Sequence, residues 1–317
     1  MSLRKSYRQH FCCLLFCLLL LTLTGCKKED KTAAAPAATA AETFASPDEA
    51  GAALLQAAKS GDAANVLAIF GSAAKDLVYS GDPAEDKAAF TGFVSDYQQM
   101  HRWRALEGGN QLLITGSDNK AFPIPLVKEA NGRWSFDASA GKEEILARRI
   151  GRNELASMDI ITAIAVAQME YFAQKHDGTA QFAQKFISDE GTQDGLYWPS
   201  VEGKPRSPIG PLVAFASAEG LKIKPDSHQP FHGYFYRLLD AQGAGAKGGA
   251  KKYSVNGKMT GGFAVVAYPA SYGDSGIATF MMSQQGVLYE KDLGKTTNEI
   301  ASAMTEFNPD KSWKVVR

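Results

Sequence analysis

The sequence predicts an α+β fold, in which helices and antiparallel strands occupy separate stretches of the chain. Three stretches with helical start signals or spacing come first, and a short group of strands follows them. One long helical pattern then runs from Lys142 to about Lys175, and short strand patterns separated by turns fill much of the rest. Runs of helices followed by runs of strands are typical of α+β domains. We therefore expect an N-terminal α+β domain (residues 46–141) and a second domain (residues 142–317).

The N-terminal domain is expected to open with three helices. The run Ser46-Pro47-Asp48-Glu49 combines a capping box with proline at the first helical position, and it predicts a helix to about Ser60. Asp62 can cap a second helix, and Asp82-Pro83-Ala84-Glu85 repeats the start signal for a third. The basic run His101–Arg104 is typical of a helix end, where positive charge interacts favourably with the helix dipole. It could alternatively bind an anion.

Three strands are expected after these helices, at Gln111–Thr115, Phe122–Lys128 and Arg133–Asp137. Asn131-Gly132 between the last two is a strong hairpin signal. Prolines alternate in the middle strand, which favours an edge or a bulge because proline donates no backbone hydrogen bond. The pattern resembles an abbreviated nuclear-transport-factor-2-like fold.

The second domain is expected to pack a long helix on an antiparallel meander. Gly151 lies inside the helical pattern, where it indicates a bend or a domain boundary, and Asp177-Gly178 ends the pattern. Gln285-Gly286 predicts a hairpin, and Trp313 is expected to pack late on the core. The arrangement resembles the globular part of pilins and pseudopilins. The expected helices are 182–187, 207–219 and 295–307, and the expected strands are 233–239, 252–255, 261–268, 277–283 and 287–290.

The N-terminus has the pattern of a lipoprotein signal peptide (residues 1–25). Three basic residues precede the apolar segment Phe11–Leu23, which is too short to span a bilayer. The run Leu23-Thr24-Gly25-Cys26 resembles the lipobox of bacterial lipoproteins, which implies cleavage before Cys26 and acylation of its thiol and new amine. The alternative is an ordinary secretory signal that contains a cysteine. Lys27, rather than Asp, favours the outer membrane, with the protein facing the periplasm.

Cleavage at this site would leave Cys26 as the sole cysteine. The mature chain would then contain no internal disulfide, no cysteine-ligated zinc and no cysteine nucleophile. It would carry 31 basic and 34 acidic residues, and this near-neutral balance argues against nucleic acid as a partner. The low-complexity residues 26–45 are expected to form a disordered tether to the membrane. No cofactor is predicted.

The run Gly273-Asp274-Ser275-Gly276 suggests a catalytic site. Gly-Asp-Ser-Gly surrounds the nucleophile of chymotrypsin-like proteases, where the serine needs a histidine base oriented by a carboxylate. His232 is the nearest upstream base, and Asp274 and Ser275 complete the candidate set. The all-β fold of those proteases is incompatible with the predicted helices. A tight turn accounts for the same four residues.

Two loops contain residues that bind metals in other proteins. Asp226, His228 and His232 form one cluster, but the flanking prolines argue against the helical spacing that would align two histidines. The second loop combines His176-Asp177-Gly178 with the acidic residues 189, 190 and 194, where a pseudopilin-like protein could hold calcium. Helix termination explains the glycine equally well. We therefore predict no metal site.

Aromatic residues in two runs are candidates for a ligand or partner surface. Tyr197 and Trp198 form one group, and Tyr234 and Tyr236 form the other. They could line a groove for a glycan or a peptide, or they could pack in the core.

Several longer runs are found at Phe122–Val127, Arg148–Leu155, Asp194–Pro199, His232–Phe235 and Tyr272–Gly276. Together they resemble an uncharacterised family of bacterial lipoproteins known as a domain of unknown function. The resemblance covers most of the mature chain and implies an envelope location and a two-part α+β fold, but no activity.

These observations lead to three hypotheses for function. The first is a non-catalytic, membrane-anchored lipoprotein that binds an envelope protein or scaffolds envelope machinery, with the pilin-like half as its contact surface. The second is a small-molecule or glycan-binding module with a pocket in the N-terminal half. The third is a hydrolase centred on Ser275 and His232.

Overall fold

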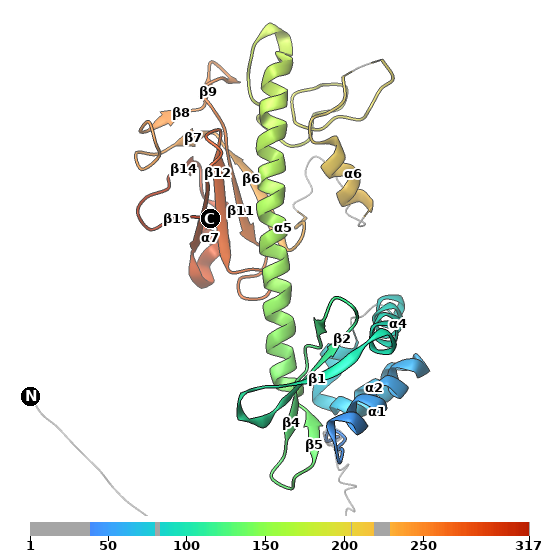
Figure 1. Ribbon diagram of the computed structural model, residues 1–317. Helices are drawn as coiled ribbons and strands as arrows, with labels where there is room; N and C mark the ends of the chain where they lie inside the picture. The colour runs from blue at the N-terminus through green and yellow to red at the C-terminus, as the bar shows by residue number, and fades with distance from the viewer. Residues whose placement is uncertain (1–38, 80–82, 204, 219–228, 317) are drawn as a thin grey trace, which may run out of the picture. The chain divides into compact units, whose positions relative to one another are not determined.

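The computed structural model describes residues 39–79, 83–203, 205–218 and 229–316 of the 317-residue chain. The described residues form helices and mainly antiparallel sheets, and this confirms the α+β class (Figure 1). The expected signal peptide and Cys26 lie outside these ranges.

Helices and short 3-10 turns occur mainly in the first two thirds of the chain. The helices are α1 (Pro47–Ser60), α2 (Ala63–Phe70), α3 (Lys75–Val78), α4 (Pro83–Gln99), α5 (Ala138–Gln174), α6 (Gly210–Ala218) and α7 (Thr297–Ser302). The 3-10 turns are η1 (Ser72–Ala74), η2 (Glu107–Gly109), η3 (His176–Gly178) and η4 (Gly294–Thr296).

The strands form two larger sheets and two small ones. The first larger sheet contains β1 (His101–Ala105), β2 (Gln111–Thr115), β3 (Lys120–Ala121), β4 (Leu126–Lys128) and β5 (Trp134–Phe136). The second contains β6 (Tyr234–Leu239), β11 (Ala264–Pro269), β12 (Ala278–Ser283), β13 (Leu288–Asp292) and β15 (Lys314–Val315). The small sheets contain β7 (Ala241–Gln242), β8 (Lys251–Lys252) and β14 (Glu306–Phe307), and β9 (Ser254–Val255) with β10 (Lys258–Met259).

The first two helices begin where their capping residues predict. The Ser46 hydroxyl accepts a hydrogen bond from the Glu49 N–H at 3.1 Å. The Glu49 carboxylate accepts from the Ala45 N–H at 2.7 Å, one residue earlier than in the usual capping box. Asp62 accepts from the Ala64 N–H at 2.8 Å and caps α2. The expected cap at Asp82 lies outside the described residues.

The basic run His101–Arg104 forms strand β1, so the expectation that it ends a helix is wrong. It pairs antiparallel with β2, and Trp103 lies opposite Leu113. Arg102 and Arg104 are exposed while Trp103 between them is partly buried, which is the two-residue period of a strand. Pairing with β2 therefore outweighs the local signal of basic residues after a helix.

The prolines shorten the expected middle strand of the first sheet. Only its last residues form a strand, β4, and Pro123 and Pro125 lie between β4 and the preceding strand β3. The hairpin predicted at Asn131-Gly132 joins β4 to β5 in antiparallel register. Gly132 has a φ of 82°, which glycine adopts without the strain of a Cβ atom.

The first hydrophobic core includes a residue of the expected tether. Phe44 is buried, and it exchanges two backbone hydrogen bonds of 2.8 Å with Trp134. Its ring packs edge-to-face on the Phe136 ring, with 6.4 Å between the ring centroids. The folded body therefore begins before Ser46. The expected domain boundary at residues 141 and 142 stays a prediction.

The long helix α5 begins earlier than expected and runs without interruption through Gly151. Asp137 caps it by accepting hydrogen bonds from the N–H groups of Ser139 and Ala140, both at 3.0 Å. The helix has 37 residues and is long and apolar enough to cross a membrane by length and composition. One face of its second half packs on β11 and β12 of the second sheet.

The second sheet is the predicted antiparallel meander, except that the expected strand 252–255 is divided between β8 and β9 of the small sheets. Its strand order is β15-β13-β12-β11-β6, so β6, β11, β12 and β13 are neighbours in the order in which they occur along the chain. Gln285-Gly286 joins β12 to β13 as predicted. Every residue of β11 is buried, and the strand contacts both α5 and α7. This strand therefore forms the centre of the second hydrophobic core.

Two helices expected in the second half differ from the structure. Residues 182–187 are not helical, because Phe182 forms a bridge with Met259 and Ile187 forms one with Tyr197. The closing helix ends at Ser302 rather than at Phe307. The Arg237 guanidinium donates to the carbonyl groups of residues 301, 302 and 304, which satisfies the end of this helix. Trp313 packs at the edge of the core as predicted.

We predict that Gly151→Ala stabilises the protein. A Cβ atom at Gly151 would meet no atom within 4 Å, and alanine in a helix interior is favoured over glycine by about 1 kcal/mol. Urea unfolding should show a free energy of unfolding higher by about this amount. The control is Gly141→Ala in the same helix, where a Cβ would lie 2.7 Å from Cγ1 of Ile124 and should destabilise by about 1–3 kcal/mol. A destabilising Gly151→Ala would contradict the unbroken helix.

Candidate functional site

The Gly-Asp-Ser-Gly run lies in a tight turn between β11 and β12. The Ser275 hydroxyl accepts a hydrogen bond from the Ser271 N–H at 3.0 Å and is 3.2 Å from the Ser271 carbonyl, to which it donates. Gly273 has a φ of 76°, which this turn requires. The turn that the sequence allows is therefore present, and the Ser275 hydroxyl is bonded within it.

Three polar residues of α5 hold this turn. Arg149 forms an ion pair with the Asp274 carboxylate and donates through Nε to the Asp274 carbonyl at 3.2 Å. Asn153 donates to the Ser275 carbonyl at 2.8 Å. Glu154 accepts from the N–H groups of residues 277 and 278, both at 3.0 Å. Arg149, Asn153 and Glu154 of the 148–155 run thus attach the turn to the helix.

His232 belongs to the segment that lies beside this turn. It has a φ of 47°, and its ring lies 4.4 Å from the Phe231 ring and 6.0 Å from the Phe215 ring. A Cβ at the next residue, Gly233, would lie 2.9 Å from the Ser275 Cβ. The fold therefore brings the His232–Phe235 and Tyr272–Gly276 runs together. The pairing of His232 with Ser275 as a catalytic dyad stays a prediction.

Tyr234 and Tyr236 contribute to the second core. Tyr234 is fully buried, and its hydroxyl donates to the Ala278 carbonyl at 2.9 Å. Its ring fills the space where a Cβ of Gly276 would lie, so this position needs glycine. Tyr236 donates to the Ser157 hydroxyl at 3.1 Å. Burial raises the pKa of both tyrosines far above the ordinary range.

Trp198 is also buried, and its indole N–H donates to the Pro205 carbonyl at 3.0 Å. Tyr197 is partly buried against the same core. Trp198 and Tyr234 are therefore packed in the core, which is the alternative that the sequence left open for these aromatic residues. Whether the partly buried Tyr197 and Tyr236 contact a ligand stays a prediction.

The first candidate metal cluster falls largely outside the described residues, since Asp226 and His228 are not among them. Within the described ranges, no group of three or more histidine, cysteine, aspartate or glutamate side chains is placed to hold a metal ion.

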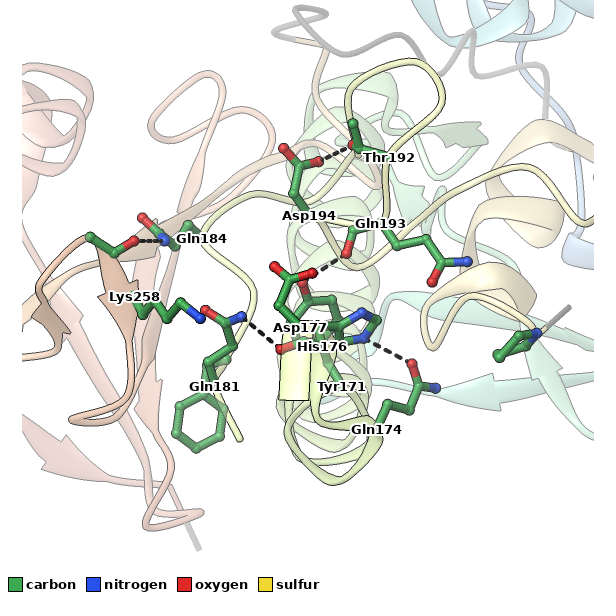
Figure 2. A pocket seen from close by; sticks show the side chains of 13 residues that line it. Tyr171, Gln174, His176, Asp177, Gln181, Gln184, Thr192, Gln193, Asp194 and Lys258 are labelled. Atoms are coloured by element: carbon green, nitrogen blue, oxygen red, sulfur yellow. Dashed lines mark hydrogen bonds between the residues drawn. The ribbon is translucent and has the colours of Figure 1, made fainter. Parts of the chain in front are cut away.

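A polar cleft of about 810 Å³ lies beside the C-terminal end of α5 (Figure 2). It combines the last turns of α5, the η3 turn, the loop 181–194 and the β9–β10 turn. Its lining residues are Tyr171, Gln174, His176, Asp177, Gln181, Phe182, Gln184, Thr192, Gln193, Asp194, Pro205, Gly257 and Lys258. A hollow of this volume is in the range that small ligands occupy.

The end of α5 positions the aromatic wall of the cleft. Lys175 and Asp177 adopt positive φ values of 52° and 53°, and the chain turns back on the helix. The His176 ring then stacks on the Tyr171 ring at 3.9 Å and meets the Trp198 ring edge-on at 5.7 Å. The predicted helix stop therefore also orients His176.

Burial changes the pKa of two groups in this wall. It lowers the pKa of His176, and nearby Asp177 acts in the opposite direction. It raises the pKa of Tyr171 to about 12, with smaller contributions from the charges of Asp194 and Asp177. Both rings are therefore uncharged near neutral pH. The Tyr171 hydroxyl donates to the Gln193 carbonyl at 2.8 Å, which fixes the loop against the helix.

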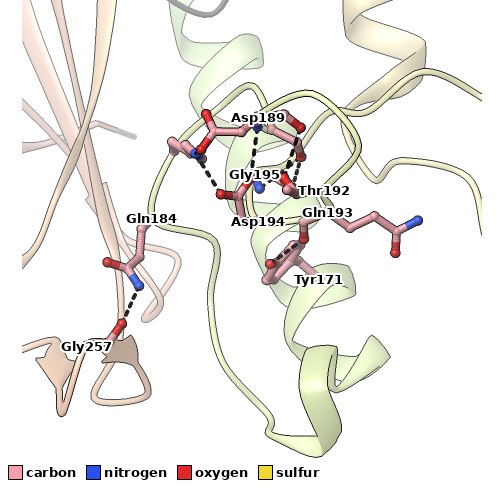
Figure 3. Close-up of polar contacts among 10 residues, drawn as sticks. Tyr171, Gln184, Asp189, Thr192, Gln193, Asp194, Gly195 and Gly257 are labelled. Carbon is pink, nitrogen blue, oxygen red and sulfur yellow. Dashed lines mark hydrogen bonds and ion pairs between the residues drawn. The ribbon is translucent and has the colours of Figure 1, made fainter.

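The acidic loop beside the cleft is held together by polar contacts of Asp189, Thr192 and Asp194 (Figure 3). The Lys185 ammonium lies 2.6 Å from the Asp189 carboxylate and 2.7 Å from that of Asp194. Asp194 also accepts from the Thr192 hydroxyl at 2.7 Å and from the Asp189 N–H at 3.0 Å. Partial burial acts to raise the pKa of Asp194, but these hydrogen bonds outweigh it and lower the pKa to about 2. The Lys185 ammonium therefore lies between two of the carboxylates that the sequence suggested as calcium ligands.

Four glutamine side chains line the same cleft. Gln174 bonds the His176 ring at 3.0 Å, Gln181 donates to the His176 carbonyl at 3.3 Å, and Gln184 donates to the Gly257 carbonyl at 2.8 Å. The Gln193 amide forms no hydrogen bond with any described residue. Each amide offers both a donor and an acceptor. The lining can thus pair with hydroxyl and amide groups.

Sequence reasoning identified part of this site. It grouped His176 and Asp177 with Asp194 as a possible ion site, and the structure brings these three residues to one cleft. It missed the glutamines, because isolated glutamines form no motif. It also missed Tyr171, which the sequence shows as one more apolar position of the long helix.

The N-terminal half contains a separate hollow of about 530 Å³. It is lined by Phe93, Phe122 and Arg148 among other residues. Its polar wall contains an ion pair of 3.0 Å between Asp96 and Lys120. This hollow lies in the N-terminal half, where the hypothesis of a small-molecule or glycan-binding module places its pocket. The charged groups Asp96 and Lys120 in its wall are already paired with each other.

We predict that His176 makes the folded state less stable in mild acid. Its pKa is lower in the folded protein than in the unfolded chain, so the unfolded chain binds the proton more readily. The free energy of unfolding should therefore fall as the pH drops below about 6.5. Urea unfolding at about pH 7.5 and about pH 5 should show a smaller loss for His176→Gln than for the wild type. An equal loss in both would show that His176 does not contribute.

One family model matches residues 41–316, and its description is "Protein of unknown function (DUF2950)". No curated protein and no solved structure matches this chain. The match covers nearly all of the described residues, including the cleft and the α5-held turn. The chain therefore belongs to the DUF2950 family of proteins of unknown function.

Proposed function

We propose that this protein is a non-catalytic binding protein of the bacterial envelope, anchored to the outer membrane by lipid on Cys26 and facing the periplasm. The signal-like N-terminus with its lipobox supports the anchor. The single observation that carries the binding function is the polar cleft at the end of α5. Several of its side chains are held by hydrogen bonds before any ligand arrives, which lowers the ordering cost of binding.

The chemistry of the cleft favours an uncharged ligand rich in hydroxyl and amide groups, such as an N-acetylated glycan. The negative charge of Asp194 is balanced by its ion pair with Lys185. Asp177 adds one negative charge to the cleft, and Lys258 adds one positive charge. His176 and Tyr171 are neutral near neutral pH. Because the cleft carries little net charge, recognition depends on the glutamine amides, while the exposed Pro205 offers apolar surface to a sugar ring.

The contacts of Ser275 support a non-catalytic function. A serine nucleophile needs its hydroxyl free to transfer a proton to a base. The Ser275 hydroxyl is instead bonded twice to Ser271, in a turn that Arg149 and Asn153 fix on α5. A structural function accounts for these residues without a reaction.

We predict that the full-length protein binds N,N′-diacetylchitobiose and that Gln193→Leu weakens this binding at least about tenfold, or about 1.4 kcal/mol. The substitution removes an amide that bonds no described residue, so the remaining hydrogen bonds of the cleft should persist. Isothermal titration calorimetry measures the affinity.

Gln56→Leu is the matched control, since Gln56 is exposed on α1 and does not line the cleft. It should bind like the wild type. The amine-bearing disaccharide chitobiose tests the preference for an uncharged ligand and should bind more weakly. Absence of heat with the acetylated sugar, or equal affinity in Gln193→Leu, would contradict this ligand class.

We predict that Cys26→Ala abolishes incorporation of radiolabelled palmitate and moves the protein from the membrane fraction to the soluble fraction. The lipobox makes Cys26 the acylated residue, and stable anchoring requires acyl chains. Cys17→Ala is the control because Cys17 lies in the apolar segment before the cleavage site. It should leave labelling unchanged. Labelling that persists in Cys26→Ala would refute the anchor but leave the cleft proposal intact.

A further inference from the structure

Strand β6 is an edge strand of the second sheet, and part of its outer edge is open. On one side it pairs with β11 over its whole length. The Gly233 carbonyl accepts from the Ala270 N–H on that side, whereas Tyr234 exchanges both of its backbone hydrogen bonds with Phe231 on the other side. Successive residues of a strand direct their backbone groups to alternate sides. The N–H and C=O groups of Tyr236 and Leu238 therefore point outward, away from β11.

These outward groups have no hydrogen-bond partner among the described residues. The open stretch is short, because Phe231 bonds Tyr234 before it and the Asp240 carbonyl accepts from the Tyr253 N–H at 2.7 Å after it. Between these two points, Tyr236 and Leu238 present two donors and two acceptors with the spacing of a strand. Both residues are only partly buried, so these groups can reach an incoming chain.

A groove of about 290 Å³ runs along this open stretch. Its lining residues are Gln184, Lys185, Phe186, Ile187, Asp189, Tyr236, Arg237 and Leu238. The opposite wall is the extended segment that pairs with Tyr197. In that parallel bridge the Phe186 carbonyl and the Ser188 N–H bond Tyr197, so the N–H and C=O groups of Ile187 point away from it. They too bond no described residue.

We propose that this groove binds an extended peptide segment of a partner protein by β-strand addition. Backbone donors and acceptors in strand register are complementary to another extended backbone. Phe186, Ile187 and Leu238 supply apolar surface for alternate side chains of the peptide. The opposite wall hinders edge-to-edge pairing of β6 with a second copy, and this favours a narrow single segment. The groove shares Gln184 alone with the residues of the polar cleft, so this inference stands apart from glycan binding.

The test begins with random heptapeptides displayed on phage and selected on the full-length protein. The best peptide is synthesised with a single N-methyl group at each position in turn. Because alternate N–H groups of an added strand bond the β6 edge, methylation should weaken binding at least about tenfold at every second position, and between them only at the one position that faces the Ile187 carbonyl. Hydrogen exchange should show that the peptide protects the amides of residues 187, 236 and 238.

Leu238→Pro and Leu238→Ala form the matched pair of variants. Proline removes the outward N–H without removing a hydrogen bond to β11, and edge strands tolerate proline at such positions. Alanine removes a similar amount of side chain but keeps the N–H. Leu238→Pro should bind the peptide at least about tenfold more weakly than Leu238→Ala. An unchanged far-UV circular dichroism spectrum and an unchanged urea unfolding midpoint relative to Leu238→Ala would show that the fold is intact.

Several outcomes would overturn the proposal. They are a selection that returns no binding peptide, equal affinity in the two Leu238 variants, and N-methyl effects without a two-residue period. Protection of the β6 edge together with a concentration-dependent dimer in sedimentation would identify a second copy as the occupant. If Leu238→Pro does not fold, the N-methyl series and hydrogen exchange on the wild-type protein decide the question.

Discussion

The packing of one face of α5 on strands β11 and β12 is the interaction on which the rest of the structure depends. The buried residues Ile160, Ile161 and Ile164 of this face join the second core. At the start of the same helix, Gly141 lies against Ile124 of the first core. Arg149 and Asn153, between these regions, hold the Ser271–Ser275 turn. A shift of α5 along its axis would therefore disturb both cores and the turn together.

The cleft is a consequence of how this helix ends. If α5 continued past Gln174, His176 would point to another side of the helix and could not stack on Tyr171. The positive φ values of Lys175 and Asp177 reverse the chain within one turn, and Gly178 completes the reversal. The returning loop then reaches Tyr171 through the Gln193 carbonyl. Helix termination and site formation are thus one event in this fold.

Signals between residues close in sequence predicted much of the fold. The caps at Ser46 and Asp62, the hairpins at residues 131–132 and 285–286, and the period of α5 depend on neighbours along the chain. Features set by distant partners were missed. β1 forms because β2 lies beside it, and residues 182–187 are extended because Met259 and Tyr197 pair with them. For the same reason the cleft glutamines, which come from separate segments, could not be recognised as one group.

The ammonium group of Lys185, which bonds Asp189 and Asp194, gives the loop an internal counter-ion. Carboxylates gathered around a soluble cation would lose their arrangement whenever the concentration of that ion fell. A cation supplied by the chain itself is present in every copy of the protein and at every ionic composition. The cleft wall that this loop forms therefore keeps its shape independently of the divalent ions around it.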